Sequence, residues 1–289
     1  MASDDKDNRP TISKVLQLYQ SQLADTTQLW HSGSVEHLDS YSDLLEYLAS
    51  KGSRHAHYRH YVSRERAMSI LDDCAFYLTD GSGWNDRFDA ARFNPWFSSY
   101  KHYGICFSSS TSESIAMWML YGGSDRNGVM IDFTSSILLQ AILLDSYECG
   151  HFEDGRFVKV SDIGREEIDL KLVDVLYFRT DEDKDEIIVY RIDDDKQVSI
   201  SRRELNGIQQ VTKHDSWSYE KEVRLVARID KISLHGKGSR ATCVRIPLRL
   251  PEDFCDTRVY DSPVSDGAGG HLDSHLLGTV EWDLCDGCR

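Results

Sequence analysis

The sequence predicts an α+β fold, in which short strands and short helices alternate without a fixed order. Two observations predict it. From about residue 57, β-rich runs alternate with helical segments that begin at Ser or Thr. These runs lack the regular strand–helix–strand rhythm that a doubly wound parallel sheet requires. We expect a helical extension over residues 1–54, a core over 55–262 and a tail over 263–289.

The helical extension is predicted from two capped segments with apolar residues at three- and four-residue spacing. Thr11 or Ser13 can cap the first segment, whose apolar residues are Val15, Leu16, Tyr19 and Leu23. A second segment begins at Ser40 or Ser42 and stops near Gly52. This front piece could pack on the core or serve as a docking surface for a partner protein.

The core is predicted from β-branched and aromatic runs between capped helices. We expect helices over Ser63–Asp72 and around Ser112–Leu120. We expect strands at His57–Tyr61, Ala75–Leu78, Gly104–Ser108, Gly128–Asp132, Asp174–Arg179, Glu222–Arg228 and Thr242–Pro247. Residues 181–195 are dense in charge and are expected to form a solvated loop or helix. Residues 261–270 are rich in turn formers and mark the start of the tail.

Composition restricts the class of protein. Hydrophobic residues make up 40% of the 289 residues and aromatic residues 10%, which is typical of a folded globular chain. The net charge is −15, which opposes broad binding to nucleic-acid phosphates. The longest apolar stretch, Ile137 to Leu144, is interrupted by Gln140 and is too short to span a bilayer. The acidic N-terminus lacks the layout of a signal peptide, so we expect a cytoplasmic protein.

The seven cysteines are scattered and odd in number, which favours reduced thiols in a cytosolic protein. One arrangement has a second interpretation. His271 and His275, followed by Cys285 and Cys288, could supply two imidazoles and two thiolates to a tetrahedral zinc ion. A single pair of cysteines at the frayed end of a chain favours solvated tail residues instead, and we expect no metal.

Four stretches could carry chemistry, and the first runs from Tyr58 to Ser63. Here Arg59, His60 and Tyr61 come directly before a helix capped by Ser63. The free N–H donors at the start of a helix attract anions such as a pyrophosphate. The alternative is a strand with aromatic core contacts and an exposed histidine.

The second and third stretches are mainly explained by structure. Residues 84–89 (WNDRFD) are typical of a turn whose Trp84 and Phe88 are pinned to the core. The hydroxyl run over residues 108–112 ends a strand and begins a helix, with Ser110, Thr111 or Ser112 as the cap. Its surplus hydroxyls would suit ribose or phosphate contacts, although turns rich in serine are common. We expect Met117 and Trp118 in the core and Tyr121 in a pocket wall.

The fourth stretch is Lys213 followed by residues 217–226 (WSYEKEVRLV). On a strand, Glu220, Glu222 and Arg224 would share one face, and Trp217 and Tyr219 the other. Two neighbouring carboxylates repel each other, which can raise the pKa of one of them. One acid could then stabilise a cationic sugar centre while the other accepts a proton. The alternative is an exposed polar face in which Arg224 neutralises Glu222.

Taken together, these stretches resemble a bacterial family, the domain of unknown function 2971, over about residues 57–230. The matching residues are Tyr58 to Leu71, Asn85-Asp86 with Phe88-Asp89, Cys106 to Ser108, Met117-Trp118 with Tyr121-Gly122, Gly128 to Phe133, and Lys213 with Trp217 to Arg224. Three positions depart from the family pattern. Trp84 replaces a Phe, Arg87 a Pro, and Leu120 a frequent His, so any role of that His is absent here.

The layout is also similar to that of ADP-ribosyltransferases, which have a first-strand His or Arg, a Ser- or Thr-bearing strand and a late Glu-x-Glu. This resemblance implies a split, two-lobed β fold that binds NAD, as a substrate, in its cleft. Glu222 would bind the ribose and stabilise the oxocarbenium-like centre, and Glu220 would orient or deprotonate the acceptor. His60 or Arg59, with Tyr61, would hold the adenosine ribose or pyrophosphate. Four further residues would brace or line the site: Ser108, Tyr121, Trp217 and Tyr219.

The resulting hypothesis is an NAD-consuming transferase whose acceptor is a protein, a nucleic acid or water. The resemblance further implies a role as a toxin or anti-phage effector, with an antitoxin or other protein as a partner. The main alternative is a non-catalytic module that binds a nucleotide or a partner protein in the same cleft. A nuclease is disfavoured, because no cluster of metal-binding carboxylates stands out in the sequence.

Overall fold

The computed structural model describes residues 55–96, 98–122, 128–134, 138, 141, 144–181, 186–192, 197–234, 240–248 and 258–261. The helices expected over residues 1–54, the tail over 263–289 and the four candidate zinc ligands lie outside these residues. Among the described residues, no helix combines the length and apolar character needed to cross a membrane.

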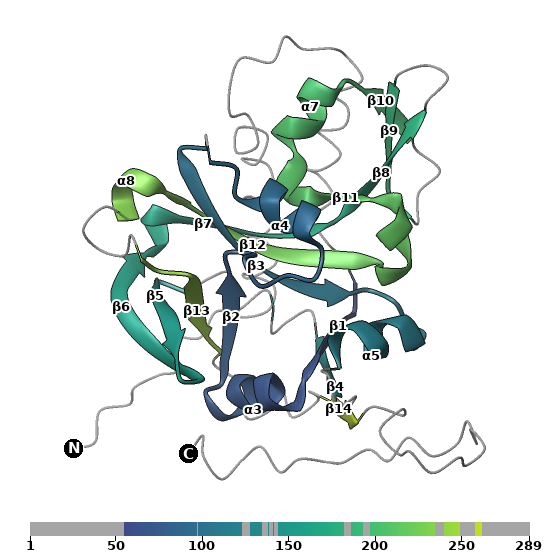
Figure 1. The fold of residues 1–289 in the computed structure, drawn as a ribbon. Helices are drawn as coiled ribbons and strands as arrows, with labels where there is room; N and C mark the ends of the chain where they lie inside the picture. Colours follow the sequence, from purple (N-terminus) through teal and green to yellow (C-terminus); the bar gives the residue numbers. More distant parts are fainter. Residues whose placement is uncertain are drawn as a thin grey trace, which may run out of the picture.

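The described part of the chain is a mixed α/β fold dominated by strands (Figure 1). The helices are α3 (Arg64–Asp72), α4 (Arg87–Phe93), α5 (Ile115–Tyr121), α7 (Arg202–Gly207) and α8 (Lys231–Leu234). The strands are β1 (His57–Ser63), β2 (Ala75–Thr79), β3 (Tyr100–Ser108), β4 (Gly128–Thr134), β5 (Ser146–Glu153), β6 (Arg156–Gly164), β7 (Ile168–Asp174), β8 (Leu176–Asp181), β9 (Glu186–Tyr190), β10 (Gln197–Ile200), β11 (Thr212–His214), β12 (Glu222–Asp230), β13 (Cys243–Pro247) and β14 (Arg258–Asp261).

The larger sheet branches at β3. Along one edge, β3 pairs with β12 over its whole length, from Tyr100 opposite Asp230 to Ser108 opposite Glu222. The other edge is shared, because β1 pairs near Ser108 and β2 pairs at Gly104. Beyond β3 the sheet therefore continues in two directions, through β1, β4 and β14 and through β2, β13, β5 and β6. This branching curls the sheet into half a barrel (Figure 1).

The smaller sheet has the strand order β10-β9-β8-β11. The loop or helix expected over residues 181–195 is wrong here, because β9 pairs with both β8 and β10. The apolar residues explain the correction. Ile187 and Val189 alternate with more exposed neighbours and are buried, which is the two-residue period of a half-buried strand.

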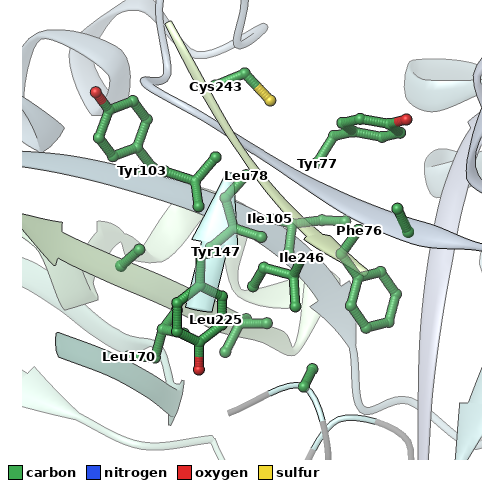
Figure 2. Packing of buried hydrophobic residues seen from close by; sticks show 14 of the residues in the cluster. Phe76, Tyr77, Leu78, Tyr103, Ile105, Tyr147, Leu170, Leu225, Cys243 and Ile246 are labelled. Atoms are coloured by element: carbon green, nitrogen blue, oxygen red, sulfur yellow. The ribbon is translucent and has the colours of Figure 1, made fainter. Parts of the chain in front are cut away.

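The main hydrophobic core lies against the larger sheet. Aromatic and aliphatic side chains from strands far apart in sequence meet there, as Figure 2 shows for Phe76, Tyr103, Ile105, Tyr147 and Leu225, among others. A second cluster packs α4, α7 and the smaller sheet against the opposite face of β12, where Val226 contributes. Both faces of β12 are consequently covered, and polar side chains on this strand must find partners inside the protein.

Most of the expected elements are confirmed with shifted ends. Ser63 caps α3 as expected, since its side chain accepts a hydrogen bond from the Arg66 backbone. The cap of α5 is Ser114, not Ser110, Thr111 or Ser112. Phe88 is also corrected, because it is 85% exposed on α4 and is not pinned to the core. Strands β5 and β6 were not expected, and β6 carries exposed charges along much of its length.

Candidate active site

A cavity of about 560 Å³ opens between the two parts of the curled sheet and α5. This volume lies in the range typical of small-molecule sites. One wall comes from β1 and α3 and includes Arg59, His60 and Arg66. A second part of the lining, the acidic wall, holds Glu220 and Glu222.

Glu220 and Glu222 reach this cavity by a route that differs from the expected one. Residues Asp215–Glu220 form a 3₁₀ turn, η4, and β12 begins only at Glu222. Between them, Lys221 adopts a left-handed conformation with φ 44°. The expectation that both acids project from one strand is therefore wrong for Glu220. The left-handed residue instead reverses the chain direction locally and brings the two carboxylates to the same cation.

That cation is Lys213, on the short strand β11. Its Nζ donates hydrogen bonds to Oε2 of Glu220 at 2.6 Å and to Oε2 of Glu222 at 2.9 Å. All three side chains are at most 5% exposed. Because buried charges are costly unless paired, Lys213 is what allows two carboxylates to share this interior position.

Arg224 supplies the second buried cation and is fully enclosed. Its Nε donates to Oε1 of Glu222 at 2.5 Å, its Nη1 donates to the carbonyl of Gln210 at 2.9 Å, and its Nη2 contacts Asp89. The rings of Trp84 and Phe93 lie 4.9 and 5.9 Å from the guanidinium carbon. The alternative of an exposed polar face is wrong, although Arg224 does pair with Glu222.

The two acids differ in their expected protonation. Burial, followed by the charge of Glu222, raises the pKa of Glu220 to about 7. Burial opposes the ionisation of Glu222 as well, but the charges of Arg224 and Lys213 hold its pKa well below the ordinary value. Near neutral pH the pair thus combines a permanent carboxylate with one that can gain or lose a proton.

Tyr121 completes the surroundings of Glu220. Its Oη donates a hydrogen bond of 2.7 Å to Oε1 of Glu220, and the residue lines the cavity. Burial and then the charge of Glu220 raise the pKa of Tyr121, so the phenol stays a donor.

His60 lines the same cavity as a neutral imidazole, with its ring 5.7 Å from that of Phe107. Its Nδ1 lies 2.8 Å from the carbonyl of Cys106, and a carbonyl only accepts, so Nδ1 carries the proton. Burial lowers the pKa of His60 to about 4, and the charge of Arg66 acts in the same direction. His60 can therefore contact a ligand through hydrogen bonds but contributes no positive charge.

The positive charge on this wall comes from Arg59 and Arg66. Arg59 lies opposite Asp132 in the sheet, with its Nε 3.6 Å from Oδ2. Arg66 lies in the first turn of α3. Tyr61, in contrast, packs edge-on against Trp118 at 5.0 Å between ring centroids, and its side chain also borders the cavity.

Residues 117–225 match the family model described as protein of unknown function (DUF2971). Over these residues the chain is similar to the DUF2971 family. No curated protein and no solved structure matches the chain significantly.

The DUF2971 match covers the acidic wall of the cavity, from α5 through Glu220 and Glu222. It confirms the family resemblance drawn from the sequence. The matched residues begin after β3, so His60 and Cys106, together with the segment 84–89, contribute to the same cavity from outside the matched range.

Ser108 stabilises the backbone that carries Glu220. Its Oγ donates to the carbonyl of Glu220 at 2.7 Å, and Ser109 bonds the carbonyl of Lys221 through both its backbone and its hydroxyl. The surplus hydroxyls of this run are thus used to hold the turn between η4 and β12. Neither serine lines the cavity.

Trp217 and Tyr219 also lie outside the cavity lining. Trp217 is half-buried, with its ring 4.8 Å from Nζ of Lys213, and Tyr219 is 41% exposed. The 3₁₀ turn explains their position, because η4 breaks the strand alternation on which their placement was predicted.

Sequence reasoning assigned no role to Lys213, Asp89 or Cys106. The thiol of Cys106 borders the cavity, but burial and then the charge of Glu222 raise its pKa, which makes it a poor nucleophile. Lys213 and Asp89 did belong to the quoted family motifs. What the sequence could not show is that both meet Arg224 and the two glutamates inside the protein.

Metal binding has little support in the part of the chain that the structure describes. No group of three or more His, Cys, Asp or Glu side chains there is arranged to hold a metal ion. Each carboxylate of the acidic wall instead contacts Lys213 or Arg224.

Proposed function

We propose that this chain is an NAD-consuming enzyme that cleaves the nicotinamide–ribose bond and transfers ADP-ribose to a protein, a nucleic acid or water. The observation that carries the proposal is that His60 lines one cavity with Glu220 and Glu222, although it lies far from both of them in sequence. A role as a toxin or anti-phage effector is part of the same proposal.

The two carboxylates suit the two tasks that this reaction sets. Departure of nicotinamide leaves positive charge on the ribose, and a fixed negative charge lowers the barrier to it. Glu222, whose pKa is held low by Arg224 and Lys213, would provide that charge. Glu220, with a pKa raised by burial to about 7, would take the proton from the acceptor.

The wall formed by β1 and α3 suits the rest of the substrate. Arg59 and Arg66 would compensate the pyrophosphate charge beside the start of α3. His60, as a neutral donor and acceptor, would contact the adenosine ribose. Tyr121 and Trp84 place aromatic rings along the cavity for a flat heterocycle.

The fold is compatible with the split, two-lobed arrangement that the ADP-ribosyltransferase resemblance implies. The branch at β3 separates the sheet into two directions, and two hydrophobic clusters lie on opposite faces of β12. We propose this fold relationship together with the activity.

A non-catalytic binding module is the second candidate, and one observation favours it. Both oxygens of Glu222 already accept hydrogen bonds, from Arg224 and from Lys213. A carboxylate compensated by two cations stabilises a neighbouring sugar cation less than a free one would. In this second candidate function, the cavity binds a nucleotide or a partner protein and catalyses no reaction.

Nicotinamide release from NAD separates the two candidates. The purified full chain would be assayed at high enzyme concentration, with water alone and with added protein or nucleic-acid acceptors. Glu222→Gln is expected to lower the rate by about 10²–10³, which is the effect of removing one strong electrostatic contact. The matched control is Glu148→Gln, because Glu148 also pairs with two cations, Arg245 and Lys159, but lies outside the cavity.

Circular dichroism and thermal unfolding would first establish that both variants are folded. Loss of nicotinamide release in Glu222→Gln alone supports the transferase or glycohydrolase. Equal release by Glu222→Gln and the wild type would reject the role of Glu222. No release by the wild type with any acceptor would reject the enzyme in favour of the binding module.

A further inference from the structure

Apart from Trp84, the segment 84–89 has no part in the chemistry proposed above, yet it reaches the centre of the site. Asp86 caps α4 by accepting hydrogen bonds from the backbones of Phe88 and Asp89. One turn into the helix, Asp89 is 3% exposed and its carboxylate contacts Nη2 of Arg224. A helix start more than 130 residues away in sequence is thereby tied to the strand that carries Glu222.

Arg224 is held so that it links Asp89 to Glu222. Its three donor nitrogens are each used, on Asp89, on the carbonyl of Gln210 and on Glu222. The ring of Trp84, from the same segment as Asp89, covers the guanidinium at 4.9 Å. A planar guanidinium fixed at every donor has one orientation, so the position of Asp89 fixes the donor that faces Glu222.

The charges of this cluster do not balance. Three carboxylates, those of Asp89, Glu220 and Glu222, face two cations, Lys213 and Arg224. Glu222 contacts both cations, Asp89 contacts Arg224, and Glu220 has only a share of Lys213. Glu220 is therefore the least compensated acid.

A third cation, Arg92 on α4, lies near Asp89 and Arg224, but its Nη2 donates to the hydroxyl of Thr212 and it forms no ion pair with the three acids. The remaining titratable groups around Glu220 add no charge. Tyr121 from α5, Cys106 from β3, Tyr177 from β8 and Tyr219 from η4 all have a pKa raised first by burial, so they remain neutral. Burial also raises the pKa of Asp89, against the attraction of Arg224. Glu220, whose pKa is raised to about 7, is thus an acid of the cluster that can exchange a proton near neutral pH.

We infer that Asp89 is a positioning residue, which holds Arg224 against Glu222. By neutralising part of the charge of Arg224, Asp89 leaves Glu220 as the acid that keeps a proton at neutral pH. Its effect on turnover rests on the proposed function, whereas its effect on Glu220 does not. Without the Asp89 charge, two cations would face two carboxylates, and Glu220 would ionise at lower pH.

Carboxyl carbon NMR of the full chain, labelled with ¹³C in its Asp and Glu carboxyl groups, tests the inference without a substrate. Glu220→Gln and Asp89→Asn would assign the two signals. In the wild type, the Glu220 signal is expected to titrate near pH 7 while the Asp89 signal stays constant through that transition. If Asp89 is the titrating group, the inference is overturned.

Asp89→Asn is the second arm, because asparagine keeps an acceptor for Arg224 but removes the charge. The midpoint of the Glu220 titration is expected to fall by about one pH unit or more. The matched control is Asp169→Asn. Asp169 pairs with Arg228 on the same strand β12, at 3.6 Å but outside the cavity, and its loss should leave the Glu220 midpoint in place. An unchanged midpoint in Asp89→Asn would overturn the inference.

The pH profile of nicotinamide release separates this inference from the proposed function. If Glu220 is the base, the rate rises with pH through its titration, and Asp89→Asn moves that rise to lower pH. A shifted NMR midpoint in a protein that releases no nicotinamide supports the role of Asp89 and rejects the enzyme. Release with the same pH profile and midpoint in both proteins rejects the role of Asp89 and retains the enzyme.

Discussion

The hydroxyl of Tyr121 donates a hydrogen bond of 2.7 Å to Oε1 of Glu220, which joins the end of α5 to the end of η4. The other oxygen of Glu220 accepts from Lys213. Glu220 is thus held on both sides while it borders the cavity. This contact also explains why a tyrosine follows the buried Met117 and Trp118 at the end of the helix.

Removing the Tyr121 hydroxyl should change the titration of Glu220. The hydrogen bond favours the ionised carboxylate, so Tyr121→Phe is expected to raise the pKa of Glu220 above its value of about 7. Carboxyl carbon NMR would measure the midpoint. Tyr100→Phe is the control. Tyr100 begins β3, at the end of the strand away from Ser108, so this variant should leave the Glu220 midpoint unchanged. A lower midpoint in Tyr121→Phe would show that the phenol accepts a proton from Glu220 instead of donating.

The raised pKa of Glu220 predicts a stability that depends on pH. Burial and Glu222 raise this pKa from 4.5 to about 7 in the folded protein. The folded state therefore keeps a proton that the unfolded state loses, and the contribution of Glu220 is complete below pH 4.5 and is lost as the pH rises to about 7.

Glu220→Gln does not titrate and serves as the reference. The free energy of unfolding of the wild type, relative to this variant, should fall by up to about 3 kcal/mol across that window and stay constant above it. Urea unfolding at several pH values would measure the difference. A difference that grows with rising pH would contradict the assignment.

Lys213 should be essential for the stability of the acidic wall. Lys213→Met leaves Glu220 without a cation in contact, and we expect a loss of about 3–5 kcal/mol in unfolding free energy. Lys159→Met is the matched control. Lys159 also contacts two acids, Glu148 and Asp162, but it is 43% exposed, so its loss should cost far less than the loss of Lys213. Equal losses in the two variants would show that Lys213 is not the central cation.

The left-handed Lys221 predicts an unusual tolerance for glycine. A non-glycine residue at φ 44° is strained by about 1–2 kcal/mol, which glycine avoids. Because glycine also adds freedom to the unfolded chain, Lys221→Gly should change stability by about 0 to +1 kcal/mol. Lys221→Val should be destabilising. If valine were tolerated as well as glycine, the turn between η4 and β12 would differ from the one described.

Local patterns predicted much of the fold, because strand alternation and helix caps depend only on residues that are close together in sequence. They identified α3 with its Ser63 cap and the extended stretch that begins at Glu222. The strand β9 was missed because its charged flanks outweighed the alternation of Ile187 and Val189. The 3₁₀ turn at η4 was missed because a short polar run with alternating residues fits a strand equally well.

The candidate site was predictable only in part, for a different reason. The acids stood out because they lie two residues apart, and His60 because it precedes a capped helix. The links from Lys213 and Asp89 depend on pairing between distant segments, as in the contact between Asp89 and Arg224. The sequence does not show which distant segments come into contact, so the ion-pair cluster became visible only in the structure.

The most direct measurement is a crystal structure of the Glu222→Gln variant soaked with NAD, since the variant should bind NAD without consuming it. The account predicts electron density for NAD between His60 and residue 222, with the pyrophosphate on the side of Arg59 and Arg66. An empty cavity at saturating NAD, or NAD bound elsewhere on the protein, would contradict it.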